Sequence, residues 1–359
     1  MLYIKRIDLD YILTKGIENC NLIDVRSPSE YLEDHIPTAV NIPLLDDNER
    51  AIVGTIYKKE GSNKAKLKGV EIVSPKIPQF INKIKKLVDN GKETVIYCWR
   101  GGDRSEAMCA FAKLAGLNVS KLAGGYKIFR KFVYNFFTSK FSLEYKPKII
   151  VMYGPTGSAK TKILEELFKE GYPVINLEKH ACHKGSSFGF IGEKGFDSIT
   201  QKKFESRLWY NFYLLNYPKY ILIEGESKKI GKVTIPDTLF SLMNSGISIL
   251  TEPSLEFRVK YTLENYLPFT DINSITKALD KIKKYLGKKR SEQLINFYKN
   301  QKYEYFVKDL LENYYDPLYY KSLPDKIEYK ISYNTIDEGI KNVKKILQSV
   351  FNNSCTINS

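Results

Sequence analysis

The sequence has few cysteines, no long apolar run and no leader-like N-terminus. Its five cysteines, at positions 20, 98, 109, 182 and 355, are odd in number and match neither a disulfide framework nor a zinc-site spacing. The opening stretch MLYIKRIDLDYILTKGI lacks the continuous apolar segment of a signal peptide. No run approaches the ~20 apolar residues of a membrane span. We therefore expect a soluble, cytoplasmic protein that does not interact with membranes.

Acidic residues are scarce relative to basic ones. Asp and Glu number 41 against 56 Lys and Arg, which gives a formal charge of +15. A charge of this size favours a polyanionic partner, with nucleic acid first. A genome that simply encodes many lysines is the alternative. The 359 residues exceed one ordinary domain and predict two.

The first third of the chain alternates strand-like and helix-like segments. The expected strands are NLIDVR, AVNIP, ETVIYC and VSKLAGG, and the expected helices begin at Ser27, Gln79 and Arg104. This alternation predicts a parallel sheet, in which ligands bind at the carboxyl ends of the strands. Cys98 lies at one of those ends. Residues 44–79 fit the alternation poorly and read as a surface insertion or as part of a substrate site.

The pattern restarts around KFSLEYKPK, residues 140–148, which marks a domain boundary. KIIVMYG, YPVIN and YILIEG are expected buried strands, and the last ~100 residues are mostly helical. The predicted fold class is α/β. A parallel-sheet domain over residues 1–138 is followed by a P-loop NTPase-like domain over 148–350, with a helical C-terminal part.

The segment YCWRGGDRS predicts an anion-binding loop around a reactive cysteine. A thiolate needs nearby positive charge, and here it would lie between a strand and the N-terminus of a helix. Gly101 and Gly102 let the backbone curl, while Arg100 and Arg104 can grip an oxyanion, with Ser105 beside them. The loop suits a cysteine that attacks, or receives an atom from, a small oxyanion. The alternative is a buried structural cysteine, as we expect for Cys109.

GPTGSAKT, residues 154–161, resembles a P-loop, G-x-x-x-x-G-K-[ST], between a strand and a helix. Its backbone would cradle a diphosphate, Lys160 would reach an outer phosphate, and Thr161 could hold magnesium. The departure is Ala159 in place of the second glycine, which requires a negative φ or a small loop shift. The expected phosphate-binding residues are Gly154, Thr156, Gly157, Ser158, Ala159, Lys160 and Thr161.

Further side chains are candidates for the same site. Glu224 ends an expected strand beside the P-loop, and Glu226 follows two residues later. EKHACHKGSSFG contributes His183, Lys184 and Ser186 to a phosphate- or RNA-facing loop. His180, Cys182 and His183 lie close in sequence, but no second cluster completes four zinc ligands, so we expect no metal centre.

Two stretches, LIDVRSPSEYLEDHIPTAVNIP and YCWRGGDRS with KLAGGYKIF, resemble a rhodanese domain, and Asp24 and Arg26 match its supporting residues. With GPTGSAKT, NLEKHACHKGSSFG, FESRL, IEGESKKIG and YYDPLY in order, the chain resembles the bacterial tRNA 2-selenouridine synthase family. The resemblance implies replacement of sulfur by selenium in wobble 2-thiouridine, position 34 of certain tRNAs. The sulfur would first be geranylated from geranyl diphosphate, and selenophosphate would then donate selenium, carried by Cys98 as selanyl-cysteine.

The partners implied are a tRNA anticodon stem-loop, selenophosphate and geranyl diphosphate, with no tightly bound cofactor. Binding of the geranyl donor's diphosphate at the P-loop is our hypothesis from the chemistry of that loop. Two alternatives stay open. The C-x5-R spacing from Cys98 to Arg104 also fits a rhodanese-fold phosphatase or arsenate reductase, here joined to a small-molecule kinase-like domain, although Tyr97 stands where such phosphatases usually carry histidine. A binding module with a decayed P-loop would explain Ala159. The sequence does not indicate the oligomeric state.

Overall fold

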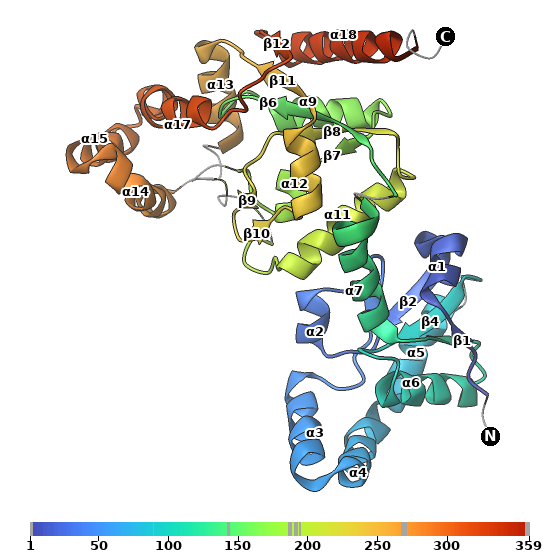
Figure 1. Ribbon diagram of the computed structural model, residues 1–359. Coiled ribbons are helices and arrows are strands. Elements are labelled where there is room, and N and C mark those ends of the chain that lie inside the picture. Colours follow the sequence, from blue (N-terminus) through green and yellow to red (C-terminus); the bar gives the residue numbers. More distant parts are fainter. Residues whose placement is uncertain are drawn as a thin grey trace. The chain divides into compact units, whose positions relative to one another are not determined.

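The computed structural model describes residues 3–88, 90–141, 144–185, 189, 193, 195–266 and 271–355. The chain divides into two compact units (Figure 1). The first consists of Met1–Phe136 and Lys202–Tyr210, and the second of Phe137–Gln201 and Asn211–Ser359. The sequence-based boundaries of 1–138 and 148–350 stay predictions. Within the described residues, no helix is long and apolar enough to cross a membrane.

The first unit is built on a parallel sheet with the strand order β1-β5-β4-β2-β3. Its strands are β1 (Arg6–Ile7), β2 (Cys20–Asp24), β3 (Val40–Asn41), β4 (Glu93–Tyr97) and β5 (Ser120–Leu122). The central strand β4 is buried along almost its whole length, as expected for an apolar run inside a parallel sheet. Cys98 directly follows it. The expected parallel sheet is therefore confirmed, with the cysteine at its carboxyl edge.

Helices connect and cover these strands. They are α1 (Leu9–Lys15), α2 (Pro28–Glu33), α3 (Asp47–Glu60), α4 (Ser62–Val73), α5 (Ile77–Val88), α6 (Asp103–Leu114) and α7 (Gly125–Asn135), with short 3-10 turns η1 (Ile17–Asn19) and η2 (Ser74–Lys76). Phe80 and Ile84 of α5 and Met108 and Cys109 of α6 pack in one apolar cluster. Residues 44–79, which interrupt the expected alternation, form the helical pair α3 and α4 and lead into α5 (Figure 1).

The second unit holds another parallel sheet, with the order β12-β11-β6-β8-β7, and a separate antiparallel pair β10-β9. The strands are β6 (Lys148–Tyr153), β7 (Val174–Ile175), β8 (Tyr220–Glu224), β9 (Lys229–Ile230), β10 (Val233–Thr234), β11 (Ile247–Thr251) and β12 (Tyr329–Ile331). The central strand β6 leads into the P-loop, and its neighbour β8 ends at Glu224. Both sequence motifs therefore meet at one edge of this sheet.

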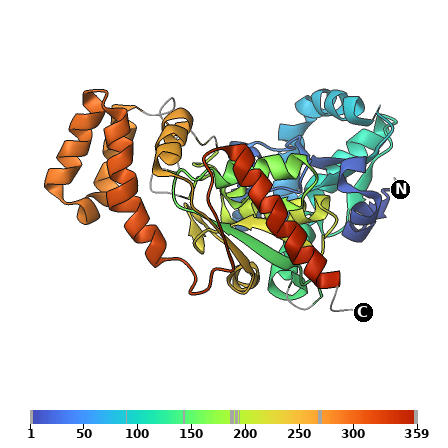
Figure 2. The same ribbon diagram turned by 90° about the horizontal axis from the view of Figure 1, so that it is seen from above.

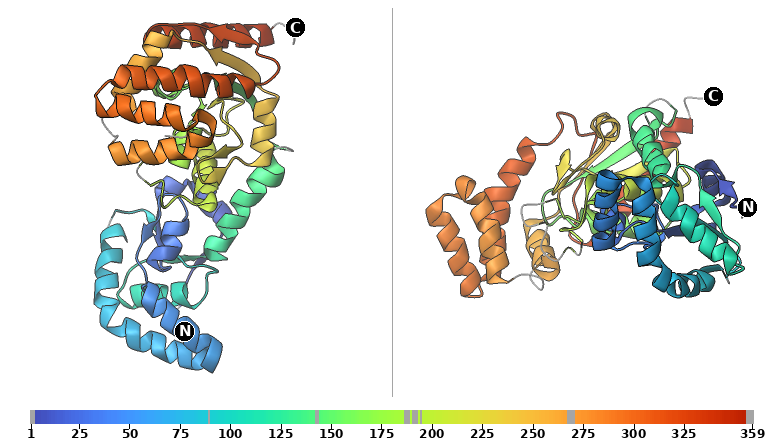
Figure 3. Two further views of the ribbon diagram at one scale, coloured as in Figure 1. Left: turned by 90° about the vertical axis from the view of Figure 1, so that its left-hand side faces the viewer. Right: turned by 90° about the horizontal axis from the view of Figure 1, so that it is seen from below.

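The helices of this unit form two groups. Those near the sheet are α9 (Lys160–Lys169), α10 (Leu177–Ala181), α12 (Asp237–Asn244) and α18 (Ile336–Cys355), and α9 and α18 share an apolar cluster with β6 and β8 (Figure 2). Helix α11 (Gln201–Leu214) is divided between the units, since its residues Lys202–Tyr210 belong to the first. The others are α13 (Leu255–Tyr266), α14 (Ile272–Leu286), α15 (Lys288–Lys299), α16 (Tyr303–Leu310) and α17 (Asp316–Lys321), with π-helical turns η3 (Phe136–Lys140) and η5 (Leu311–Tyr315). Helices α13 to α16 have their own core (Figure 3). The predicted α/β class with a helical C-terminal part is confirmed.

Candidate functional site

The cysteine loop runs from Cys98 to Gly102, between β4 and α6. Cys98 is 3% exposed, and its Sγ lies 3.2 Å from the Ser105 hydroxyl. That hydroxyl in turn donates to the Gly102 carbonyl at 3.0 Å. The loop thus curls around the sulfur, and the first turn of α6 supplies a polar side chain to it. This arrangement brings Cys98, Gly102 and Ser105 together as the sequence predicts.

Two glycines make this curl sterically feasible. Gly101 has a φ of 66°, in the left-handed region that favours glycine. Gly125, at the start of α7, has a φ of 59°, and a Cβ there would overlap the carbonyl oxygen of Cys98. The next amide, that of Tyr126, donates to this same carbonyl at 2.8 Å. The GG pair in KLAGGYK is therefore the second wall of the cysteine loop.

The two loop arginines lie in different surroundings. Arg100 is exposed, whereas Arg104 donates to the Glu30 carboxylate at 2.6 and 3.3 Å. Arg50, from α3, reaches the same carboxylate at 3.0 Å. Sequence reasoning did not single out Glu30. The signal was available, since Glu30 occupies the N3 position of a capping box whose N-cap is Ser27.

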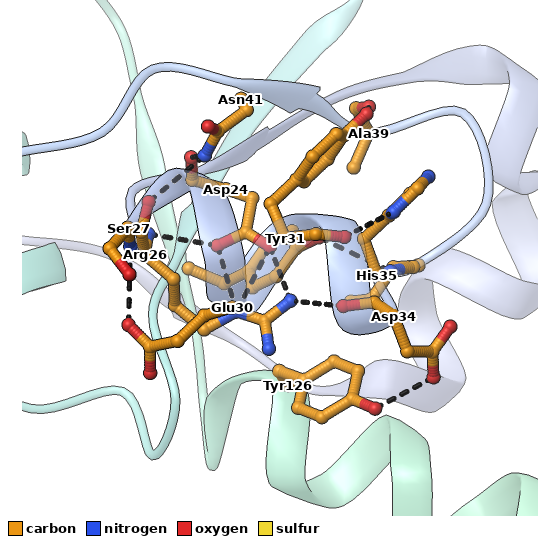
Figure 4. Close-up of polar contacts among 12 residues, drawn as sticks. Asp24, Arg26, Ser27, Glu30, Tyr31, Asp34, His35, Ala39, Asn41 and Tyr126 are labelled. Atoms are coloured by element: carbon orange, nitrogen blue, oxygen red, sulfur yellow. Dashed lines mark hydrogen bonds and ion pairs between the residues drawn. The ribbon is translucent and has the colours of Figure 1, made fainter. Parts of the chain in front are cut away.

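A buried polar network joins the end of β2, the end of α2 and Tyr126 of α7 (Figure 4). Arg26 is 1% exposed and donates to the Asp24 carboxylate and, at 2.7 Å, to the carbonyl of Asp34. Its guanidinium stacks 3.9 Å from the ring centre of Tyr126. The Tyr126 hydroxyl donates to the Asp34 carboxylate at 2.7 Å. Asp24 and Arg26 therefore hold the strand ends together and do not face a substrate.

Tyr97 belongs to the same support. It is fully buried, and its hydroxyl accepts a hydrogen bond from the Ile36 amide at 3.2 Å. Burial raises the pKa of this phenol well above its usual value, so it stays neutral. The residue that precedes the cysteine thus acts as a structural brace.

The P-loop spans residues 154–159 between β6 and α9. Lys160 donates to the carbonyl of Gly154, and the Thr161 hydroxyl donates to the Glu178 carboxylate at 2.9 Å. Ala159 has a φ of 57°, so a negative φ, one of the two ways in which the sequence could accommodate alanine here, does not occur. The loop keeps the left-handed turn that glycine normally provides, and alanine bears the steric cost, about 1 to 2 kcal/mol.

Residues far along the chain brace this loop. Arg258 of α13 donates to the Thr156 carbonyl at 2.9 Å and forms a two-point ion pair with Asp316 of α17. The Tyr319 hydroxyl accepts from the Gly154 amide at 2.6 Å. Asp316 and Tyr319 lie in the segment YYDPLY. Neither residue is among the site residues predicted from the sequence, where only the order of the family-like segments indicated their place.

A cavity of 870 Å³ opens over the P-loop. All the predicted phosphate-binding residues, Gly154, Thr156, Gly157, Ser158, Ala159, Lys160 and Thr161, line it. Glu178, Lys184 and Glu226 face the same space, together with Tyr261 and Tyr319. The volume lies within the ~300–1,000 Å³ of typical small-molecule sites. The sequence-predicted loop is thus one wall of a ligand-sized cavity.

Three carboxylates gather at this edge of the sheet. The Glu178 amide donates to Glu224 at 3.0 Å, and Glu224 is fully buried. Burial and repulsion from Glu178 raise the pKa of Glu224 well above its usual value. The same two causes raise the pKa of Glu226 to about 8. Glu226 is therefore mostly protonated at neutral pH, which lowers the repulsion that an anionic ligand beside Lys160 would meet.

The histidine-containing segment contributes only in part. His183 is 8% exposed and packs its ring 5.4 Å from that of Phe196, and it does not line the cavity. Burial lowers its pKa, so it is neutral. Lys184 does reach the cavity, while Ser186 lies outside the described residues. Within the described ranges, no group of three or more His, Cys, Asp or Glu side chains is arranged to hold a metal ion.

These features define the class of protein. It has a rhodanese-type cysteine loop on one parallel sheet and a P-loop on a second. Family models agree, with a rhodanese-like domain over residues 11–131 and the tRNA 2-selenouridine synthase AAA domain over residues 147–350. The chain belongs to the tRNA 2-selenouridine synthase family, as its sequence motifs predict.

Full-length relatives support this assignment. The tRNA 2-selenouridine synthase of Nitrosomonas europaea is 32% identical, with 88% of this chain and 92% of the relative covered. That of Bdellovibrio bacteriovorus is also 32% identical, with 89% and 93% covered. The similarity therefore spans both units.

Proposed function

We propose that this protein is a tRNA 2-selenouridine synthase that converts wobble 2-thiouridine to 2-selenouridine in two steps. The observation that carries the proposal is the presence of two anion loops of different chemistry in one family member. One loop surrounds a cysteine and the other presents Lys160 to a cavity. Each step needs one of them.

In the first step, the base sulfur attacks the first carbon of geranyl diphosphate. The new S–C bond forms as the C–O bond breaks, diphosphate leaves, and N3 of the base loses its proton. The P-loop amides and Lys160 suit the departing diphosphate. A bound magnesium ion would supply further positive charge there. Thr161 and Glu178, which hydrogen-bond to one another, are the groups nearest to the expected position.

In the second step, selenium replaces the alkylated sulfur. An S-alkyl group leaves as a singly charged thiolate, which is easier than expulsion of sulfur from a thione. Selenophosphate would bind at the cysteine loop, with Arg100 and the loop amides as its partners. The Cys98 thiolate would attack its selenium, so that the S–Se bond forms as the Se–P bond breaks and phosphite leaves with that electron pair, which gives selanyl-cysteine. The buried position of Cys98 shields such an adduct from water.

Nucleoside mass spectrometry after reaction with tRNA, geranyl diphosphate and selenophosphate tests both steps. Cys98→Ala should abolish 2-selenouridine and leave geranylated thiouridine to accumulate. Lys160→Ala should slow geranylation about a hundredfold, since a lost anion contact at a reacting group costs that much. Selenouridine formation by Cys98→Ala would disprove the role of the thiol. Unchanged geranylation by Lys160→Ala would place the diphosphate elsewhere.

A further inference from the structure

A second cavity, of 850 Å³, lies within the first unit. Helices α3 and α4 and the N-terminal part of α6 form its walls. Most of its lining is apolar, including Leu44, Leu45, Val53, Val70, Val73 and Phe111. Tyr57 and Val70 stay 60% and 63% exposed on this surface. Neither the selenium step nor the P-loop accounts for this open apolar space.

Two glycines keep the cavity wide. Gly54 lies in the middle of α3 and Gly69 in the middle of α4, and both line the cavity. A Cβ at either position would meet no atom within 4 Å. Alanine would fit and would favour each helix by roughly 0.5 to 1 kcal/mol. The helices therefore give up stability at the two positions where a side chain would enter the cavity.

The cavity adjoins the cysteine loop. Leu44, Leu45 and Val73 line it and also belong to the apolar cluster that contains Cys98. Asp103 and Arg104, which directly follow the loop, line it too. The next residue is Ser105, whose hydroxyl contacts the Cys98 sulfur. An apolar group in this cavity would thus lie beside the first turn of α6, which holds Ser105 against the Cys98 sulfur.

The charges around the cavity complement an RNA-borne group. Four lining side chains are cationic, namely Arg50, Lys58, Lys66 and Arg104, and two are acidic, Asp103 and Glu106. Arg50 and Arg104 pair with Glu30, and Lys66 pairs with Asp103. The small excess of positive charge that is left favours a ligand attached to a polyanion, whereas the apolar walls favour a hydrocarbon. An alkylated tRNA base carries both.

We propose that this cavity holds the geranyl chain of the S-geranylated wobble base while selenium displaces its sulfur. This inference rests on the proposed function and adds a binding site to it. The outer selenium of selanyl-Cys98 adds to C2 of the base, and the C2–S bond breaks with its electron pair on sulfur. A small-molecule thiolate then attacks the Cys98 sulfur, so that the S–Se bond breaks with its electron pair on selenium and Cys98 is left as a mixed disulfide that a second thiol reduces. Geranylthiolate then takes a proton from solvent and departs through the open side of the cavity. The bound chain would hold C2 beside Cys98 and select alkylated over unmodified thiouridine.

Filling the cavity tests the idea. Gly54→Leu and Gly69→Leu point a side chain into the space, and Lys59→Leu, which is exposed on α3 outside the cavity, is the matched control. The substrates are anticodon stem-loops with either S-geranyl- or S-methyl-2-thiouridine, used with selenophosphate in single turnover. Wild-type enzyme should act on the geranyl substrate at least tenfold faster. Both glycine variants should lose that preference with the methyl substrate unaffected, and Lys59→Leu should keep it.

Equal slowing of both substrates, or of neither, overturns the cavity assignment. The alanine variants Gly54→Ala and Gly69→Ala should fold at least as stably as wild type and give a smaller loss of preference in the same direction. If the leucine variants do not fold, the alanine variants therefore still test whether the cavity binds the geranyl chain. If wild-type enzyme makes no geranylated base from geranyl diphosphate, the proposed function fails. If it makes and consumes that base without sensitivity to these variants, only the cavity is misassigned.

Discussion

Arg104 and Glu30 form a two-point ion pair that links the helix after the cysteine loop to the helix after β2. Burial opposes ionisation of Glu30, but the Arg104 guanidinium outweighs it and lowers the pKa of the carboxyl. The arginine that the sequence suggests as an anion ligand is thus held in place by an internal partner. Its position beside Cys98 depends on a residue 74 positions away.

Replacement of Glu30 by glutamine should destabilise the first unit by about 1 to 2 kcal/mol at pH 7, the usual worth of a charged hydrogen bond. Since the folded-state pKa is lowered, this contribution is present above the unfolded pKa and disappears as pH falls below it. Urea unfolding followed by tryptophan fluorescence measures it, because both tryptophans, Trp99 and Trp209, belong to the first unit. Glu71→Gln, which breaks an exposed pair with Lys68, should change little. If the difference in unfolding free energy between wild type and Glu30→Gln were the same near pH 3 as at pH 7, its origin in the ion pair would be contradicted.

A side chain at Gly125 should disrupt the cysteine loop. Gly125→Ala brings a Cβ into the Cys98 carbonyl, so selenation should drop about a hundredfold while geranylation continues. Gly116→Ala is the matched control, because Gly116 also has a positive φ, 76°, but open space around it. It should cost only backbone strain. Similar losses of selenation in both variants would mean that strain, and not the contact with the loop, is responsible.

Glycine at position 159 should stabilise the protein. Ala159→Gly relieves a left-handed alanine and should raise the stability of the second unit by about 0.5 to 1 kcal/mol, after the entropy gained by the unfolded chain. Ala278→Gly, in the middle of α14, should lower stability by a similar amount or more. Differential scanning calorimetry can compare the two. A destabilised Ala159→Gly variant would show that the alanine methyl has a packing role that exceeds its strain.

Diphosphate affinity should depend on the ionisation of Glu226. With a pKa of about 8, the carboxyl is neutral at pH 7 and charged at pH 9. From pH 7 to pH 9, the affinity of wild type for geranyl diphosphate should fall about fivefold to tenfold more than the affinity of Glu226→Gln does. Since the folded pKa is raised, the same group contributes stability below its unfolded value that is lost as pH rises through 8. Calorimetric titration would test the binding, with the exposed Glu256→Gln as control. Parallel pH profiles for wild type and Glu226→Gln would exclude the effect.

The sequence predicts local features of this fold well. The spacing of Phe80 and Ile84 predicts the helix that the structure places at Ile77–Val88, because such periodicity reports directly on the buried face. ETVIYC likewise predicts β4 and the position of Cys98. Each of the two anion loops is also one continuous segment between a strand and a helix, so its residues can be predicted from the sequence alone.

Long-range pairings could not be predicted in the same way. Arg258 braces Thr156 across 102 positions, and Tyr319 braces Gly154 across 165. Nothing in the local pattern of α13 or α17 distinguishes these residues from other surface side chains. The positive φ of Ala159 is another case, and there Tyr333 donates to the carbonyl of the preceding Ser158 across 175 positions. Tertiary contacts override local preference at such positions.

The segment Lys202–Tyr210 completes the first unit although the Phe137–Gln201 part of the second unit precedes it in sequence. Its Ser206 hydroxyl gives Asp34 a hydrogen bond at 2.7 Å, and Trp209 packs edge-on against Phe129. During synthesis on the ribosome, residues 1–138 emerge well before these partners exist. Until α11 has been translated, Asp34 and Phe129 of the nascent first unit therefore lack their partners Ser206 and Trp209. Expression fragments that end near residue 138 would lack Lys202–Tyr210 and would leave this part of the first unit uncovered.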